Sequence, residues 1–225
     1  MSSSDLARAI RAGLVERADA QAARQMQRYM KSAMPFLGVA KPGRTDLMRK
    51  LRSRLGDDVV VAAAADDLWD GADHREERYM AISLARTLAP TPQRLDTYRR
   101  WIESGAWWDY VDEIAPHLVG PILRAEPVVV TPIIESWTTE SSRWTRRASI
   151  ICQLGSKGRT DTDLLATAIE ASISESDFFL RKGIGWALRQ HAYTDPAWVS
   201  AFIDSHPDLS PLSRREGSKH LPRSD

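Results

Sequence analysis

The chain has 225 residues, of which 43% are hydrophobic and 27% are charged, and its formal net charge at pH 7 is +1. This length is sufficient to bury one continuous core, so we expect a single domain over residues 1–225. No apolar run reaches the ~20 residues of a membrane span and the N-terminus lacks the apolar core of a secretory signal, so we expect a cytoplasmic protein with no membrane partner.

Apolar side chains at helical spacing predict a succession of helices in the first half of the chain. The run VVVAAAADDLW after Asp58 would also suit a buried strand at its valines, but its length and its alanines favour a helix. Thr91 has the character of an N-cap followed by Pro92 at the first helical position, and this helix should reach about Glu103. Helices are predicted over residues 5–18, 20–30, 45–55, 59–69, 74–88 and 91–103.

Helix signals continue to the end of the chain. Asp195 followed by Pro196 repeats the N-cap arrangement, and Ser213 with Glu216 has the spacing of a capping box that would open a last short helix. About a dozen short helices, with no alternating strand pattern, indicate an all-α array of helix pairs. Trp69, Trp101 and Trp137 recur near the period of a two-helix repeat, and stacked pairs would form a solenoid with a concave groove.

The near-neutral total charge conceals an uneven distribution. Residues 101–140 contain seven acids and a single base, Arg124, whereas residues 141–160 contain five bases and no acid. Residues 178–194 add three more bases without an acid. The C-terminal half is therefore predicted to carry a basic face suited to a polyanion, although most charge clusters are solvated helix faces.

The stretch SGAWWDYVDEIAPHLV, residues 104–119, combines aromatic and acidic side chains. On a helix, Trp108 and Asp112 are four residues apart and project from one face. An aromatic ring and a carboxylate both favour a developing positive charge, as in the oxocarbenium-like transition state of glycosidic bond cleavage. The alternative is that the indole packs in the core and the carboxylate is solvated.

A second aromatic stripe is cationic. In FFLRKGIGWALRQH, Lys182, Trp186 and Arg189 share one helical face, and in RWTRRASIICQL, Trp144 and Arg147 are three residues apart. Because burial of Lys182 and Arg189 without partners would be costly, the stripe should face an anionic ligand. An intramolecular salt-bridge face is the alternative.

Five separated segments resemble, in the same order, the AlkD family of bacterial DNA alkylation repair glycosylases. They are YMKSAMPFLGVAKPGR (29–44), WWDYVDEIAPHLVG (107–120), WTRRASIICQL (144–154), DFFLRKGIGWALRQHA (177–192) and PLSRREGSKHL (211–221). The resemblance implies a HEAT-like helical solenoid that wraps duplex DNA in a concave basic groove. It also implies excision of cationic N3- and N7-alkylated purines by a protein that uses no metal or organic cofactor, and we expect a monomer.

The resemblance also implies roles for individual positions. The catalytic carboxylate falls on Asp112, and the indoles that bracket the deoxyribose of the lesion fall on Trp108 and Trp186. The arginine that holds the adjacent phosphate falls on Arg147, and an aromatic near the DNA backbone falls on Tyr29. The family often has two basic residues after the proline of the first segment, whereas here Thr45 follows Arg44, which removes one backbone contact. Further DNA contacts are expected from Lys182, Arg189, Arg146 and Arg215.

The chemistry of the lesion explains why so few groups would suffice. An N3- or N7-alkylated purine already carries a positive charge, so it leaves as a neutral base and needs no general acid. One carboxylate is then enough, whereas an ordinary glycosidase uses two. The resemblance implies contact through sugar and phosphate without base flipping, unlike most base-excising enzymes.

Other candidates in the sequence are weaker. The five histidines show no HxxxH or HxH spacing, so a metal site at His117 is not expected. The single cysteine, Cys152, excludes an internal disulfide, and its apolar neighbours predict a buried thiol. Asp109 is a rival to Asp112, and Trp107 is expected in the core. Two other functions remain open: a noncatalytic repeat module that binds DNA, and a scaffold that binds an acidic protein.

Overall fold

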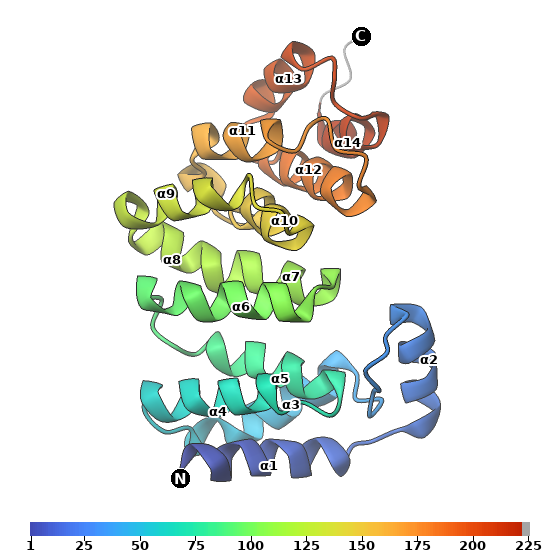
Figure 1. The fold of residues 1–225 in the computed structure, drawn as a ribbon, viewed down its shortest axis with the longest axis vertical. Helices are drawn as coiled ribbons and strands as arrows, with labels where there is room; N and C mark the ends of the chain where they lie inside the picture. Colours follow the sequence, from blue (N-terminus) through green and yellow to red (C-terminus); the bar gives the residue numbers. More distant parts are fainter. Residues whose placement is uncertain (222–225) are drawn as a thin grey trace. The chain divides into compact units, whose positions relative to one another are not determined.

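A computed structural model describes residues 1–221, and all regular structure in this part of the chain is helical (Figure 1). The chain divides into two compact units, Met1–Ala89 and Pro90–Asp225. The first contains α1 (Ser3–Val15), α2 (Ala20–Met30), α3 (Lys41–Leu51), α4 (Asp58–Asp70) and α5 (Arg75–Ala85). The second contains α6 (Leu95–Gly105), α7 (Trp108–Ile114), α8 (Gly120–Ala125), α9 (Pro127–Trp137), α10 (Arg143–Ile151), α11 (Thr162–Glu170), α12 (Phe178–His191), α13 (Pro196–Ser205) and α14 (Pro211–Gly217).

The all-α prediction is confirmed, and several boundaries agree closely. The helix predicted over 20–30 is α2, and the ambiguous valine and alanine run forms α4. Asp195 caps α13, since its carboxylate accepts the Trp198 N–H at 2.9 Å. No helix within residues 1–221 is both long and apolar enough to cross a bilayer.

Two predicted helix starts were wrong, and the first is that of α3, which begins at Lys41 and not at residue 45 because Pro42 lies in its first turn. The start expected at Thr91 is correct in position, with Pro92 as the first helical residue, but Thr91 makes no side-chain cap and the first turn, Pro92–Arg94, is 3-10 and leads directly into α6. Ser213 and Glu216 do not open the last helix, because Ser210 caps it and Pro211 occupies its first position. The capping pattern was misassigned because both side chains are used in tertiary contacts, which the sequence does not reveal.

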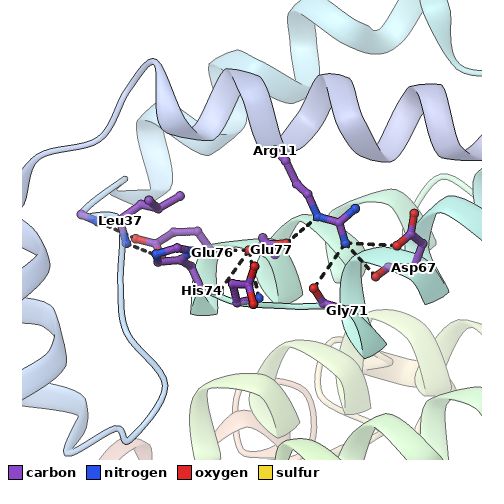
Figure 2. A network of polar contacts seen from close by, with 9 residues as sticks. Arg11, Leu37, Asp67, Gly71, His74, Glu76 and Glu77 are labelled. Carbon is purple, nitrogen blue, oxygen red and sulfur yellow. Dashed lines mark hydrogen bonds and ion pairs between the residues drawn. The ribbon is translucent and has the colours of Figure 1, made fainter.

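A buried carboxylate organises the first unit. Glu76 on α5 is fully buried, and its two oxygens accept the backbone N–H groups of Leu37, Gly38 and Val39 at 2.8 to 3.0 Å (Figure 2). Three N–H donors satisfy a charge that would otherwise be costly to bury. Glu76 therefore fixes the segment between α2 and α3.

Gly38 is required in this segment for steric reasons. Its φ is +87°, and a Cβ there would lie 2.1 Å from the Asp19 carbonyl oxygen, next to the start of α2. The same corner is held from α1, where the Arg11 Nε donates to Glu77 at 2.7 Å (Figure 2). The approach of α2 to this segment thus depends on a residue without a side chain.

We expect Glu76→Gln to lower the free energy of unfolding by about 2 to 3 kcal/mol, because the amide removes the charge and turns an N–H group toward backbone donors. Denaturant unfolding measures this. Glu103→Gln is the matched control: Glu103 pairs with Arg99 on an exposed helix face and should cost less than about 1 kcal/mol. Equal losses in the two variants would contradict the role of Glu76.

The second unit is built around α10, which packs against α6, α7, α9, α11 and α12. Trp101 on α6 and Trp137 on α9 are fully buried, as is Trp69 on α4 in the first unit. Cys152 at the end of α10 is buried as predicted, and burial raises the pKa of its thiol to about 12. A thiol with this pKa is not a nucleophile near neutral pH.

Candidate active site

The start of α7 is anchored by aromatic packing. Trp107 precedes the helix, and its ring lies 5.9 Å from that of Trp144 on α10 and 5.7 Å from that of Phe179 on α12. Trp107 is half-buried in this cluster, in the packing role expected of it. Trp108, the first residue of α7, is also half-buried, and Asp112 follows it by four residues on the same helix. The cluster therefore fixes the point from which the predicted indole and carboxylate project.

Asp112 forms a bidentate ion pair with Arg147. The Nε and Nη2 atoms of Arg147 donate to the two carboxylate oxygens at 2.8 and 2.9 Å. The side chain of Arg147 is 5% exposed and that of Asp112 is 17% exposed. The carboxylate thus lies in a largely dewatered position, with one edge accessible and the other held in a fixed orientation.

Two opposing effects act on the pKa of Asp112. Burial raises this pKa above its usual value of 3.8, and the hydrogen bonds and charge of Arg147 lower it; nearby Asp109 and Glu113 raise it further, and the net direction is upward. Arg147 is therefore the group that keeps Asp112 ionised in a position where burial favours the protonated form.

A proline one turn after Asp112 distorts the helix. Pro116 has no N–H group, so it cannot donate to the carbonyl of Asp112 four residues earlier. The chain responds with a π turn, Ala115–Val119, in which the Gly120 N–H bonds to the Ala115 carbonyl. Turns of this kind are frequent at functional sites, and this one directly follows the candidate carboxylate.

The other side of Arg147 contacts α12. Its Nη1 donates to the carbonyl of Phe179, and a Cβ on Gly183 would lie 3.1 Å from Nη1. Trp186, half-buried, stands one turn beyond Gly183 on α12. Arg147 therefore connects the helix that carries Trp108 and Asp112 to the helix that carries Trp186. The sequence analysis did not single out Gly183, although a glycine inside a helix is a signal of close packing.

If Asp112 is catalytic, we expect Gly183→Ala to lower the reaction rate by about 3- to 10-fold, because the added methyl group must displace the Arg147 guanidinium by a few tenths of an ångström. Alanine has the higher helix propensity, so thermal stability should not fall in parallel. Gly43→Ala in α3, where the added methyl group would likewise lie 3.1 Å from one side chain, that of Val39, is the control. A rate equal to that of the control would contradict the role given to Gly183.

The predicted cationic stripe on α12 is paired within the protein. Lys182 and Arg189 both contact the carboxylate of Glu216 on α14, at 3.2 and 2.8 Å, and Lys219 adds a third contact at 2.8 Å. Hydrogen bonds from Lys219 and then Lys182 hold the pKa of Glu216 at about 2. The salt-bridge alternative thus describes these side chains, but three cations around one carboxylate leave this face positively charged.

Close helix packing places Glu216 there. A Cβ on Gly185 would lie 2.5 Å from the Cβ of Glu216, so α12 and α14 approach closely at this glycine. Glu216 was expected only as a capping residue, and its contact with α12 was not predicted. A second glycine within α12 was the available signal.

The remaining predicted DNA contacts differ in accessibility. Arg146 is turned inward: it pairs with Glu175 at 2.8 Å and donates to Ala171 and Ser172. Both Nη atoms are therefore engaged within the fold, and Arg146 as a DNA contact stays a prediction. Arg215 is exposed, on α14.

Tyr29 lies in the first unit and is 76% exposed, on α2. Met30 is the one buried residue of this helix. Arg24, Arg28 and Lys31 are also exposed there, and within residues 1–221 none of these three cations forms an ion pair. The helix thus presents an aromatic ring among cations. The sequence analysis named only Tyr29, although the absence of acids from residues 20–31 was visible.

The other candidate residues are placed as follows. In residues 1–221 no group of three or more His, Cys, Asp or Glu side chains is arranged to hold a metal ion. His117 is exposed and lies 3.8 Å from Glu113, and Asp109 is half-buried in the first turn of α7. Arg44 precedes Thr45, the position where the family often has a second basic residue. It donates to the Val39 carbonyl at 2.6 Å and covers the Tyr79 ring.

Fold and site together define an all-α protein in which an ion-paired carboxylate and a half-buried indole share one helix of the second unit. The chain belongs to the DNA alkylation repair enzyme family, whose sequence model matches residues 10–221. A predicted DNA alkylation repair enzyme from Enterococcus faecalis has a similar structure, with a TM-score of 0.80 and 29% identity over 92% of this chain and 98% of that one. The smu.31 protein of Streptococcus mutans UA159 shares the fold, with a TM-score of 0.61 and 19% identity over 80% of this chain and 96% of that one. No curated protein matches the sequence.

Proposed function

We propose that this protein is a DNA glycosylase that hydrolyses the N-glycosidic bond of cationic N3- and N7-alkylated purines in duplex DNA. The observation that carries the proposal is the Asp112 carboxylate, oriented by Arg147 and standing one helical turn from Trp108. A dewatered, fixed anion stabilises positive charge far better than a solvated one. Membership of the DNA alkylation repair enzyme family supports DNA as the substrate.

In the proposed reaction the bond between C1′ and the purine nitrogen breaks, and its electron pair goes to the base. The base leaves neutral, because those electrons cancel the charge that alkylation placed on it. Positive charge develops on the deoxyribose, where Asp112 opposes it. Water then adds to C1′ and loses one proton, which Asp112 or the solvent accepts.

The indoles of Trp108 and Trp186 would assist with their electron-rich faces. Each such contact with a developing cation contributes about 0.5 to 2 kcal/mol, which corresponds to less than about thirtyfold in rate. The carboxylate is therefore assigned the larger share.

The proposal includes the arrangement of the substrate. The chain would form one HEAT-like solenoid domain that holds duplex DNA in a concave groove, with contact through sugar and phosphate and without base flipping. A polyanionic ligand is supported by three features: Tyr29 with the cations of α2, the positive face around Trp186, and the exposed Arg215. Arg147 could donate to a phosphate only through N–H groups that do not already bond to Asp112 or Phe179.

The test is release of free base from methylated duplex DNA by the purified protein at moderate temperature, with a metal chelator present. We expect release of 7-methylguanine and 3-methyladenine above the spontaneous rate. Tight binding of methylated DNA without release would instead identify a noncatalytic DNA-binding module. Failure of duplex DNA to bind at all would favour the scaffold function.

A further inference from the structure

Three cations meet at the C-terminal end of α10 without a carboxylate partner. Arg124 lies in the last turn of α8, and Lys157 and Arg159 belong to the 3-10 turn Lys157–Arg159 that follows α10. Arg124 donates from Nη1 to the Ser156 hydroxyl at 3.3 Å, and the charge of Arg159 reaches Arg124. Within residues 1–221, none of the three forms an ion pair. We call Arg124, Lys157 and Arg159 the α10-end cluster.

The rest of the basic stretch 141–160 is neutralised. Arg143 pairs with Asp177 at 3.0 Å, Arg146 with Glu175 at 2.8 Å, and Arg147 with Asp112. The stretch loses its partners only at Lys157 and Arg159, and the charge of Arg159 acts on Arg124, the single base of the acidic stretch 101–140. Two segments of opposite net charge therefore contribute to one cationic cluster.

The fold keeps this cluster together at a cost. The pKa of the half-buried Arg124 guanidinium is lowered, mainly by burial and to a smaller extent by the charge of Arg159. A nearby acid would relieve the repulsion, but the Asp161 carboxylate instead caps α11 by accepting the N–H groups of Asp163 and Leu164. A bound polyanion would relieve the same repulsion.

The backbone around the cluster is open to a large ligand. A Cβ at Gly155 or Gly158 would meet no atom within 4 Å, and the side chains of Lys157 and Arg159 are exposed. Lys157 adopts a left-handed conformation, with φ of 54°, which a lysine rarely takes. The cationic side chains of Lys157 and Arg159 and the glycine backbone next to them are therefore both accessible at the surface.

We propose that the α10-end cluster binds phosphates of the duplex DNA backbone at a position separate from the ion pair of Asp112. The proposal rests on the proposed function, which supplies the duplex as the polyanion. Between Arg147 and the end of α10 at Cys152 the helix rises about 7 to 8 Å, roughly the axial rise of two nucleotides along one strand. The cluster therefore adds a second, sequence-independent contact to the same substrate.

The test is the salt dependence of binding to an undamaged duplex by the full chain. The variant Lys157→Asn/Arg159→Gln removes two charges, and asparagine tolerates the left-handed conformation at 157. We expect the slope of log K against log salt to become shallower by about 1 to 2, because each lost phosphate contact removes about 0.9.

The control variant is Arg49→Gln/Lys50→Gln, which removes the same charge from residues that pair with Asp46. A slope that changes no more in the Lys157 and Arg159 variant than in this control would overturn the proposal. Because the slope is measured on undamaged DNA, it tests the cluster even if no base is released. A protein that excises bases but shows an unchanged slope would refute only the cluster.

Discussion

Asp112→Asn is expected to lower the rate of 7-methylguanine release by at least about tenfold, or about 1.4 kcal/mol of transition-state stabilisation. The amide has the shape of the carboxylate but no charge to oppose the developing sugar cation. Duplex affinity should stay close to that of the original chain. Single-turnover release with saturating protein separates the chemical step from binding.

The control for this prediction is Asp109→Asn, on the same helix. Asp112→Asn also leaves the buried Arg147 without its charge partner, so the free energy of unfolding should fall by about 3 kcal/mol, and the assay must run well below the unfolding temperature. Unchanged release in the folded Asp112→Asn protein, or a larger loss in Asp109→Asn, would contradict the assignment of Asp112.

Arg147→Gln should shift the acid limb of the pH–rate profile to higher pH. Arg147 opposes the effect of burial on the pKa of Asp112, so its removal raises that pKa further. At a given pH a smaller fraction of Asp112 is then ionised, and the rate falls by about tenfold or more at acid pH and by less at alkaline pH. Rates of base release between pH 5 and 9 measure the shift.

The same ion pair determines how stability depends on pH. A carboxyl group whose pKa is raised by folding favours the folded state below its unfolded pKa, and this contribution is lost as pH rises through the folded pKa. In Arg147→Gln the loss should extend to higher pH than in the original chain, as unfolding curves at several pH values would show. If the only effect of the variant were a shallower salt slope for DNA binding, Arg147 would be a phosphate contact alone.

The sequence was informative where the determinants are local. Apolar side chains at helical spacing placed α2 and α4, and the Asp195 and Pro196 pair placed the start of α13. Trp108 and Asp112 were expected on one face if their segment was helical, and both lie on α7. These predictions succeed because hydrogen bonds within a helix and at its caps join residues close together in the chain.

The partners of the charged side chains depend instead on tertiary packing. The sequence showed Arg147, Lys182 and Arg189 as cations and could not pair them with Asp112 and Glu216, which are 27 to 35 residues away in the chain. Glycines inside α12 allow α10 and α14 to approach closely enough for these contacts. The sequence by itself determined the helices, the family resemblance and the residue types of the site. Only the tertiary structure decided which charges are neutralised and which remain for a ligand, because ion pairing depends on distances between helices that local spacing does not encode.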